Sequence, residues 1–260
     1  MRPNSAKEKL KAGNVVVGSQ IQQFRSTEPP RIFAAAGAEF LWIDMEHGSF
    51  DFETAQDIVR ATADAGPTPI VRVGDLQYTL VARALDLGAQ GVILPRLEAV
   101  EQLREAISWT RFPPDGRRGY GLSGPALRYQ RASMSEVIEH ANLHTLVIVQ
   151  FETIAAIERQ DELLALPGVD VAFVGPADLS VALGVPGQLD HPRFIETVTR
   201  LIDSCNRHGV APGIHLRAAE LATEWLERGM RFISVGNEHQ FLLELAAEVF
   251  ARLAGSRNVQ

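Results

Sequence analysis

Lysine is scarce in this chain of 260 residues, and every lysine lies close to the N-terminus, at Lys7, Lys9 and Lys11. Enzymes that activate a carbonyl substrate as a Schiff base need a lysine whose amino group is desolvated in the active site. None of the three lies on a predicted strand, so we expect no buried amino group for such chemistry. A carbonyl reaction in this protein would therefore need a different electron sink.

Other absences narrow the class of protein further. The single cysteine, Cys205, lies in a predicted helix, cannot form an internal disulfide, and is expected to be a buried structural thiol. No stretch approaches the roughly 18 apolar residues of a membrane helix, and residues 1–11 lack the apolar core of a signal peptide. The net charge is -7 without a basic cluster, which disfavours nucleic acid and anionic lipid as partners. We expect a cytoplasmic protein that binds neither nucleic acid nor membranes.

The residues that are present favour one α/β domain over 1–260. Hydrophobic residues make up 46% of the chain and charged residues 22%, so a sizeable core can form. Short apolar runs alternate with amphipathic helical patterns along the chain. The predicted strands are 14–18, 40–44, 69–73, 91–94, 145–150, 170–174, 210–213 and 231–235. The predicted helices are 29–36, 52–64, 77–87, 98–110, 153–165, 191–208, 217–227 and 238–254.

Eight strands, each followed by a helix, predict a (β/α)8 TIM barrel with parallel strands. An additional N-terminal helix opens at the capping-box pattern Ser5-Ala6-Lys7-Glu8. A doubly wound sheet is the alternative, but the Gly-x-Gly-x-x-Gly signature after its first strand is absent. A long loop at about 111–143 contains a short predicted helix near 133–142. The C-terminal helix, 238–254, carries an apolar stripe that can pack on the barrel wall or on another subunit.

Four polar side chains stand just beyond predicted strands: Asp44, Arg72, Glu152 and Asp178. In an α/β barrel the carboxyl ends of the strands gather such groups into one site. Glu152 and Asp178 follow the adjacent strands five and six, where two carboxylates repel unless a proton or cation lies between them. A hard divalent ion such as Mg²⁺ or Mn²⁺ suits carboxylate, water and substrate oxygens. The alternative is that each acid caps its following helix.

The segment after strand two, Asp44-Met45-Glu46-His47-Gly48, places a histidine three residues after an aspartate. Asp44 can orient His47, which would then serve as a general base near neutral pH; a solvated loop histidine is the alternative. Arg72 can bind a substrate carboxylate or stabilise an enolate oxygen, or else pair with Asp44 or Glu46.

Other candidate groups carry weaker signals. His140 and His144 are four residues apart but lack a metalloprotease motif, so we expect a helix surface. His215 follows strand seven, where a loop histidine and a pocket residue are both possible. Gly236-Asn237 lacks the glycine density of a phosphate-binding loop, which disfavours phosphorylated substrates.

Taken together, these segments resemble the HpcH/HpaI aldolase family, metal-dependent class II pyruvate aldolases built on a (β/α)8 barrel. The resemblance runs in order over about residues 10–250. The motifs that carry it are Trp42-Ile43-Asp44-Met45-Glu46-His47-Gly48, Val71-Arg72-Val73, Ala84-Leu85-Asp86-Leu87-Gly88-Ala89-Gln90-Gly91, Val149-Gln150-Phe151-Glu152-Thr153 and Val174-Gly175-Pro176-Ala177-Asp178-Leu179-Ser180.

The resemblance implies that Glu152 and Asp178 ligate Mg²⁺, Mn²⁺ or Co²⁺, and that the ion chelates the carboxylate and keto oxygens of a 2-oxo acid. Gln150 and the segment Gly175-Pro176-Ala177-Asp178, through the backbone N–H of Ala177, would contact this substrate.

By the same resemblance, His47, beside Asp44, would act as the base through metal-bound water, and Arg72 would stabilise the enolate. Asp86 matches an acid that raises the basicity of the histidine. The resemblance also implies hexamers, as trimers of dimers, that exchange the last helix.

The expected reaction is reversible cleavage of a 4-hydroxy-2-oxo acid to pyruvate, or hydroxypyruvate, and an aldehyde. A metal Lewis acid agrees with the lack of a strand-borne lysine. The alternatives are a related metal-enolate lyase or oxaloacetate decarboxylase on the same site, and a metabolite-binding or assembly protein with a decayed site. Two departures from the family concern the acceptor aldehyde: Pro95-Arg96 replaces a common Pro-Met, and the loop Gly119–Pro125 differs. The added arginine suggests an acidic or hydroxylated acceptor.

Overall fold

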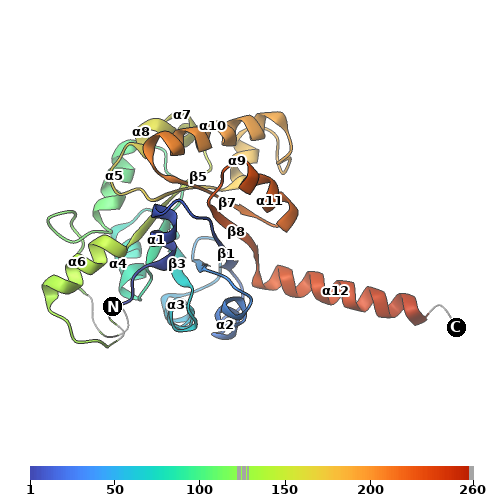
Figure 1. The fold of residues 1–260 in the computed structure, drawn as a ribbon, viewed down its shortest axis with the longest axis horizontal. Coiled ribbons are helices and arrows are strands. Elements are labelled where there is room, and N and C mark those ends of the chain that lie inside the picture. Colours follow the sequence, from blue (N-terminus) through green and yellow to red (C-terminus); the bar gives the residue numbers. More distant parts are fainter. Residues whose placement is uncertain (122–123, 125–126, 128, 258–260) are drawn as a thin grey trace.

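The computed structural model of this chain describes residues 1–121, 124, 127 and 129–257. Eight parallel strands pair in sequence order and close into a barrel, which confirms the predicted (β/α)8 fold (Figure 1). The strands are β1 (Val16–Ile21), β2 (Phe40–Asp44), β3 (Thr68–Arg72), β4 (Gly91–Leu94), β5 (Leu146–Phe151), β6 (Val171–Val174), β7 (Ala211–Leu216) and β8 (Phe232–Asn237).

Helices follow the strands and surround the barrel. They are α1 (Ser5–Lys11), α2 (Glu28–Ala35), α3 (Phe52–Ala65), α4 (Tyr78–Asp86), α5 (Val100–Ser108), α6 (Met134–His144), α7 (Ile154–Glu158), α8 (Gln160–Leu164), α9 (Pro176–Ala182), α10 (Pro192–His208), α11 (Ala219–Glu227) and α12 (Glu238–Arg257). Two features differ from the predicted pattern. The helix predicted at 153–165 is divided at Arg159, whose φ of −105° and ψ of 16° are not helical, and the short α9 was not predicted.

The barrel interior has an apolar floor and a polar upper level. Side chains at every second position of a barrel strand point inward. Near the amino ends of the strands the buried inward residues are large and apolar, and burial of each contributes about 1.5–3 kcal/mol. They include Phe40, Ile70, Ile93, Ile148, Phe173 and Phe232. Two residues further along three of these strands the inward residues are the buried polar groups Arg72, Gln150 and Ser234, and on β2 the buried Asp44 follows Phe40 and Trp42.

A second apolar layer fills the space between the strands and the helices. Cys205 lies in this layer on α10 and is fully buried, as expected of a structural thiol. Burial raises the pKa of its thiol to about 12, which leaves it protonated and unreactive at neutral pH.

The N-terminal helix α1 covers the amino end of the barrel, where Ala6 and Leu10 pack against the apolar floor. Its N-cap is Asn4, whose side-chain oxygen accepts from the backbone N–H of Lys7 at 3.0 Å, one residue before the predicted capping box. Contrary to expectation, Lys7 is a buried lysine. Its ammonium group donates to Asp170 at 2.9 Å and to the Thr145 carbonyl at 2.7 Å, and burial lowers its pKa to about 8. This lysine lies at the opposite end of the barrel from the carboxyl ends of the strands.

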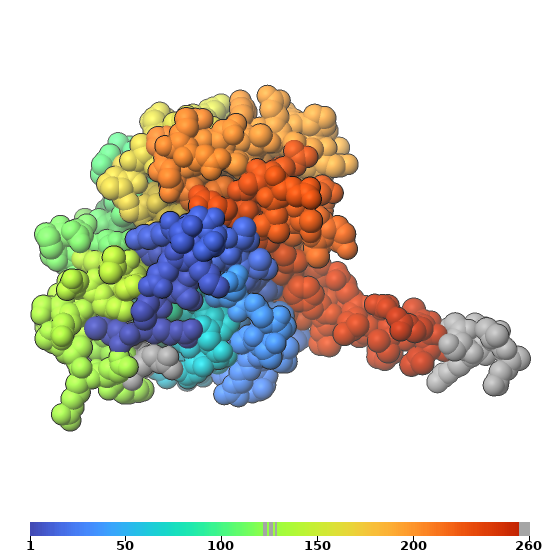
Figure 2. Space-filling view, in the orientation of Figure 1, coloured from blue at the N-terminus to red at the C-terminus, as the bar shows by residue number. Residues whose placement is uncertain are grey.

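The C-terminal helix α12 leaves the barrel after β8 and projects away from it (Figure 1). In the space-filling view it stands clear of the body of the molecule (Figure 2). Its large apolar side chains are exposed: Leu242, Leu243, Leu245, Val249, Phe250 and Leu253. Packing on the wall of its own barrel, one of the two predicted arrangements, is therefore not observed. No helix in the described part of the chain is long and apolar enough to cross a lipid bilayer.

The loop predicted at 111–143 starts at the amino end of the barrel, because α5 runs back from the carboxyl ends. Phe112 is buried there against Val137 of α6, the helix predicted near 133–142. Of the loop Gly119–Pro125, the residues Leu122, Ser123 and Pro125 lie outside the described part of the chain.

Candidate active site

Asp44 and Arg72 end neighbouring strands and are paired directly by the register of β2 and β3. The buried Asp44 carboxylate accepts from Nε and Nη2 of Arg72 at 2.9 and 2.6 Å, and from Gln20 at 2.8 Å. It also accepts from the backbone N–H groups of Glu46 and His47 at 3.0 and 3.2 Å. Burial raises the pKa of Asp44, but the hydrogen bonds and charge of Arg72 offset this, so the pKa lies below its ordinary value. A charged Asp44 thus fixes Arg72 and the turn after β2.

A chain of charges continues from Arg72 towards the rim of the barrel. The Arg72 guanidinium lies 5.0 Å from the centre of the Trp42 ring, and its Nη1 lies 3.1 Å from the Glu46 carboxylate. The other oxygen of Glu46 accepts from Nε of Arg96 at 2.7 Å. Glu46 is buried between the two guanidinium groups. The sequence suggested Glu46 only as a possible partner of Arg72, and its bridging position depends on the loop after β4.

His47 follows this turn and is half-exposed, with 49% of its side chain accessible. Its Nε2 lies 4.0 Å from Glu46. Asp44 contacts the backbone N–H of His47 and not its ring, so the expected orientation of the imidazole by Asp44 is wrong. The physical reason is that Asp44 points into the barrel, where Arg72 occupies both of its oxygens.

Glu152 stands beyond β5 and is 94% buried, since only 6% of the residue is accessible. One of its oxygens accepts from the backbone N–H of Arg96 at 2.7 Å, and the other accepts from the Gln150 amide. Burial is the main cause that raises the pKa of Glu152 above its ordinary value. The charges of Glu46 and Asp178 add to this effect, whereas the two hydrogen bonds oppose it.

Asp178 lies in the first turn of α9, which follows β6 through Gly175 and Pro176. One pocket of about 370 Å³ at the carboxyl ends of the strands contains both Glu152 and Asp178. Its lining is Glu46, Arg96, Glu98, Glu152, Thr153, Ile154, Asp178, Val181 and Ala182. The structure therefore brings the two predicted carboxylates to one cavity.

Neither acid is the N-cap residue of the helix that follows it. The N-cap of α7 is Thr153, whose hydroxyl accepts from the backbone N–H of Ala156, and the residue before α9 is Gly175. The capping alternative is therefore not observed for Glu152, whereas Asp178 lies in the first turn of α9, where the helix dipole favours an anion.

The groups around Glu152 fit a hard cation. The side-chain oxygen of Gln150 is buried and has no hydrogen-bond partner among the described residues. A Cβ atom at Gly175 would lie 3.0 Å from the Gln150 amide nitrogen and 3.1 Å from a Glu152 oxygen, so glycine keeps this space open. No group of three or more His, Cys, Asp or Glu side chains suited to a metal occurs in the described residues. A site with two carboxylates leaves positions for water and substrate, as is common for Mg²⁺.

Asp86 does not join this site within one chain. It ends α4, near the amino ends of the strands, whereas His47 follows the carboxyl end of β2. Its carboxylate accepts from Nη2 of the buried Arg118 at 2.6 Å. The expected pair of Asp86 and His47 is therefore not formed in the described part of the chain.

His215, for which the sequence left a loop position and a pocket position open, is half-buried. His215 belongs to β7 rather than to a loop, and its Nδ1 is 2.9 Å from the Ser234 hydroxyl. That hydroxyl accepts from the indole N–H of Trp42 at 2.7 Å. Burial, assisted by the charge of Arg72, lowers the pKa of His215 to about 4, so its ring is neutral at pH 7. Only the register of three strands reveals this cluster.

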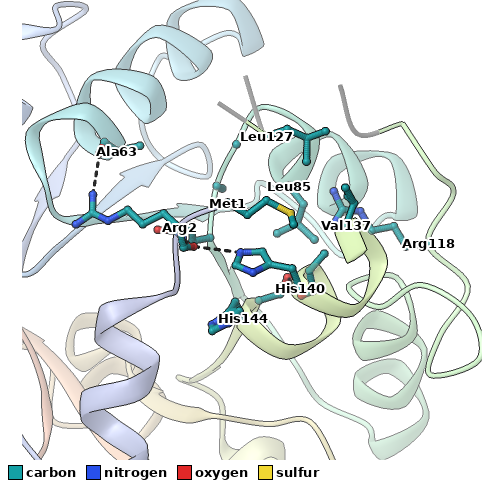
Figure 3. Close-up of a pocket in the computed structure, with 14 residues that line it drawn as sticks. Met1, Arg2, Ala63, Leu85, Arg118, Leu127, Val137, His140 and His144 are labelled. Atoms are coloured by element: carbon teal, nitrogen blue, oxygen red, sulfur yellow. Dashed lines mark hydrogen bonds between the residues drawn. The ribbon is translucent and has the colours of Figure 1, made fainter. Parts of the chain in front are cut away.

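A second pocket lies at the amino end of the barrel, between the N-terminal segment and α6 (Figure 3). There His140 contacts the Arg2 carbonyl at 3.1 Å, and His144 accepts from the backbone N–H of Asn4 at 3.3 Å. These two histidines, predicted to lie on a helix surface, hold the N-terminal segment in place. Arg118, the partner of Asp86, also lines this pocket.

Comparison with known proteins finds relatives that are named as aldolases or as members of an aldolase family. The profile of the HpcH/HpaI aldolase/citrate lyase family matches residues 27–244. The chain is 34% identical to the 4-hydroxy-2-oxo-heptane-1,7-dioate aldolase of Escherichia coli over 98% of this chain and 96% of that one. It is 36% identical to the 2-dehydro-3,6-dideoxy-6-sulfogluconate aldolase of Pseudomonas putida over 85% and 86%. A crystal structure of an HpcH/HpaI aldolase/citrate lyase family protein from Burkholderia cenocepacia superposes with a TM-score of 0.90 and 33% identity, covering 96% and 99%.

Proposed function

This chain belongs to the HpcH/HpaI aldolase/citrate lyase family and is an aldolase of that family, and on this premise we propose how its site works. The reaction is reversible cleavage of a 4-hydroxy-2-oxo acid to pyruvate, or hydroxypyruvate, and an aldehyde. The observation that carries the proposal is the shared pocket of Glu152 and Asp178 beside the Glu46–Arg72 ion pair.

Glu152 and Asp178 would hold a divalent cation, Mg²⁺, Mn²⁺ or Co²⁺. When bound, such an ion acts as a Lewis acid that polarises the keto group of the 2-oxo acid and stabilises the charge formed in cleavage. The unpartnered oxygen of Gln150 and the open space at Gly175 support placement of the ion or its ligands beside Glu152. The raised pKa of Glu152 agrees with this role, because a cation would compensate a buried carboxylate that lacks an arginine partner.

The substrate would lie between this position and α9. Pro176 has no backbone N–H, and the first-turn N–H groups of α9, beginning with Ala177, have no acceptor inside their own helix. They are suited to the carboxylate of a 2-oxo acid. Gly175 lets that carboxylate approach the backbone, because it adds no side chain next to Gln150 and Glu152.

In the cleavage direction, His47 takes the proton from the C4 hydroxyl of the substrate. The C3–C4 bond then breaks and the aldehyde leaves. The electron pair of the broken bond stays with C3 and delocalises onto the C2 carbonyl oxygen. The Arg72 guanidinium, held by Asp44 and Glu46, faces the negative charge that develops on the C2 oxygen. Return of the proton to C3 yields pyruvate, and aldol addition follows the reverse order.

The oligomer is part of the same proposal. The exposed apolar face of α12 supports burial against another copy of this chain, in a hexamer that exchanges this helix. A water-exposed helix with so many large apolar side chains is otherwise unfavourable.

The direct test is metal removal. A chelator should abolish cleavage of 4-hydroxy-2-oxo acids, and Mg²⁺, Mn²⁺ or Co²⁺ should restore it, as measured by the release of pyruvate. Borohydride added with pyruvate should leave the protein mass unchanged, because Lys7 lies at the other end of the barrel. A covalent adduct would overturn the mechanism, and turnover of oxaloacetate alone, with no aldehyde dependence, would favour the decarboxylase.

A further inference from the structure

We propose that His215 is a further substrate-binding residue, whose Nε2–H donates a hydrogen bond to the carboxylate of the 2-oxo acid. The inference rests on the proposed aldolase function and adds a residue that lies outside the five motifs of the family resemblance. His215 interrupts the otherwise apolar strand β7 and is half-buried near its carboxyl end. A polar side chain in such a place is costly unless its polar atoms find hydrogen-bond partners.

Strand register places His215 beside Gly175. Val174 of β6 pairs directly with Ile214 of β7, so Gly175 and His215 are the next residues on the two strands. Val174 and Ile214 belong to the apolar layer between strands and helices, and the residues that follow them therefore face the barrel interior. The His215 ring meets the interior Trp42 edge to face, with 5.4 Å between the ring centres, which agrees with this direction.

Gly175 opens a space between His215 and the side chains of β5. A Cβ atom at Gly175 would lie 3.0 Å from the Gln150 amide nitrogen and 3.1 Å from a Glu152 oxygen. The proposed position of the 2-oxo acid is beside this space, because Glu152 would hold the cation that binds the acid. His215 and Gln150 would then stand on opposite sides of the substrate carboxylate.

The hydrogen bonds behind His215 fix which ring nitrogen carries the proton. The Ser234 hydroxyl is fully buried, accepts from the indole N–H of Trp42 at 2.7 Å and lies 2.9 Å from Nδ1 of His215. An indole N–H can only donate, so among the described partners of Ser234 it is Nδ1 that accepts the hydroxyl proton. The neutral ring therefore carries its own proton on Nε2, which makes no hydrogen bond to the described residues.

The ring is a neutral donor and not a second cation beside Arg72. Burial and the charges of Arg72 and Arg217 lower the pKa of His215 to about 4, and the charge of Asp44 only partly opposes them. A neutral N–H needs no acid to balance it, and its hydrogen bond to a charged acceptor is stronger than one to a neutral group. A carboxylate is therefore the part of the 2-oxo acid that gains most from this contact.

The experiment compares two polar substitutions of His215 in the whole protein with Mg²⁺. His215→Gln keeps a neutral N–H at the end of the side chain, whereas the shorter His215→Asn can still contact Ser234 but does not reach the position of Nε2. The control is His208→Asn, because His208 is paired with Asp161 at the end of α10, before β7 begins. Initial rates of addition to propanal are measured with pyruvate and with hydroxypyruvate, and pyruvate binding is measured by calorimetry.

We expect His215→Asn to raise KM for both 2-oxo acids by about 10-fold, and to change kcat and the KM of propanal by less than about 3-fold. Calorimetry should show pyruvate binding weakened by the same factor. His215→Gln should recover most of the loss, and His208→Asn should match the wild type.

Unchanged KM values in His215→Asn would overturn the inference. A fall in kcat at constant KM would also overturn it, and would assign His215 to the support of Trp42 and Arg72. An effect confined to hydroxypyruvate would place the ring at C3 of the 2-oxo acid instead of at its carboxylate, and so would contradict the proposed contact. Failure of the wild-type enzyme to add either 2-oxo acid to propanal would instead overturn the proposed function, and the inference with it.

Discussion

At the scale of single residues, the site contains a network of opposite charges that is buried except at Arg96. Asp44 binds Arg72, Glu46 bridges Arg72 and Arg96, and the backbone of Arg96 binds Glu152. Such a network is costly to break at one member, because the remaining charge is left buried without compensation. Glu152 differs from the others, since its partners are an amide and a backbone N–H rather than an arginine. This difference makes it the member that gains most from a cation.

Replacement of Glu152 by glutamine tests that point. Glu152→Gln should lower kcat/KM by at least about 100-fold and weaken Mn²⁺ binding in titrations followed by electron paramagnetic resonance. Without metal, its free energy of unfolding should equal or exceed that of the wild type, because a neutral amide removes the cost of a buried charge. The exposed Glu158→Gln on α7 is the matched control. Undiminished Mn²⁺ affinity in Glu152→Gln would exclude Glu152 as a ligand.

His215 makes stability depend on pH in a defined window. Its pKa is about 4 in the folded state and about 6.5 when unfolded, so the unfolded chain binds more protons between these values. Stability therefore rises as pH increases from 4 to 6.5 and is lost as pH falls through this window. Denaturant titrations give the free energy of unfolding of the wild type and of His215→Gln at each pH. The difference between the two proteins should change by up to about 3 kcal/mol between pH 4 and pH 6.5. A constant difference would show that His215 titrates normally.

At the scale of secondary-structure elements, register and the strand-to-helix turns assemble the site. The direct pairing of Asp44 with Arg72 follows from the register of β2 and β3, and the loops after β4 and β5 are joined through Arg96 and Glu152. α9 begins at Pro176 and carries Asp178 into the same pocket. The exception is α12, none of whose described side chains lines this pocket and whose large apolar side chains from Leu242 to Leu253 are exposed.

The proposed role of α12 predicts a change in oligomeric state. Leu245→Glu combined with Val249→Glu should dissociate the oligomer in light scattering coupled to size-exclusion chromatography. Helical content measured by circular dichroism should be nearly unchanged, because these side chains are exposed in the single chain. Ile32→Glu on α2, where 62% of the residue is accessible, is the control for loss of an exposed aliphatic group. A wild-type protein that is monomeric would contradict the proposal.

At the scale of the whole molecule, the two ends of the barrel have separate tasks. The amino end is closed by α1, with Lys7, Asp170 and Thr145 joined beneath it, and by the apolar floor of the interior. The carboxyl end holds the ionic pocket. This division explains how a chain can contain a buried lysine and still have no lysine in the candidate active site.

We expect the metal to bind only at the carboxyl end of the barrel, and this binding should stabilise the folded state of the whole chain. A ligand that binds only the folded state at 100 times its Kd adds about 2.7 kcal/mol of stability. We expect saturating Mn²⁺ to raise the Tm of the wild type by several degrees and to leave the Tm of Glu152→Gln nearly unchanged. Calorimetry with Na⁺ at the same ionic strength supplies the control. An equal shift in both proteins would place the stabilising ion elsewhere.

The sequence by itself determined the barrel and the candidate carboxylates, because strand and helix periodicity and the position of polar groups after apolar strands are local properties. The strands β2, β4 and β6 fall within one residue of their predicted ranges, and Glu152 and Asp178 share the expected pocket. Only the tertiary structure decided which charges meet. Arg72 takes the oxygens of Asp44 away from the His47 ring, and Asp86 pairs with Arg118 at the opposite end. It also revealed the Ser234–His215 contact and buried Lys7, because such pairings join segments far apart in the sequence through register and packing.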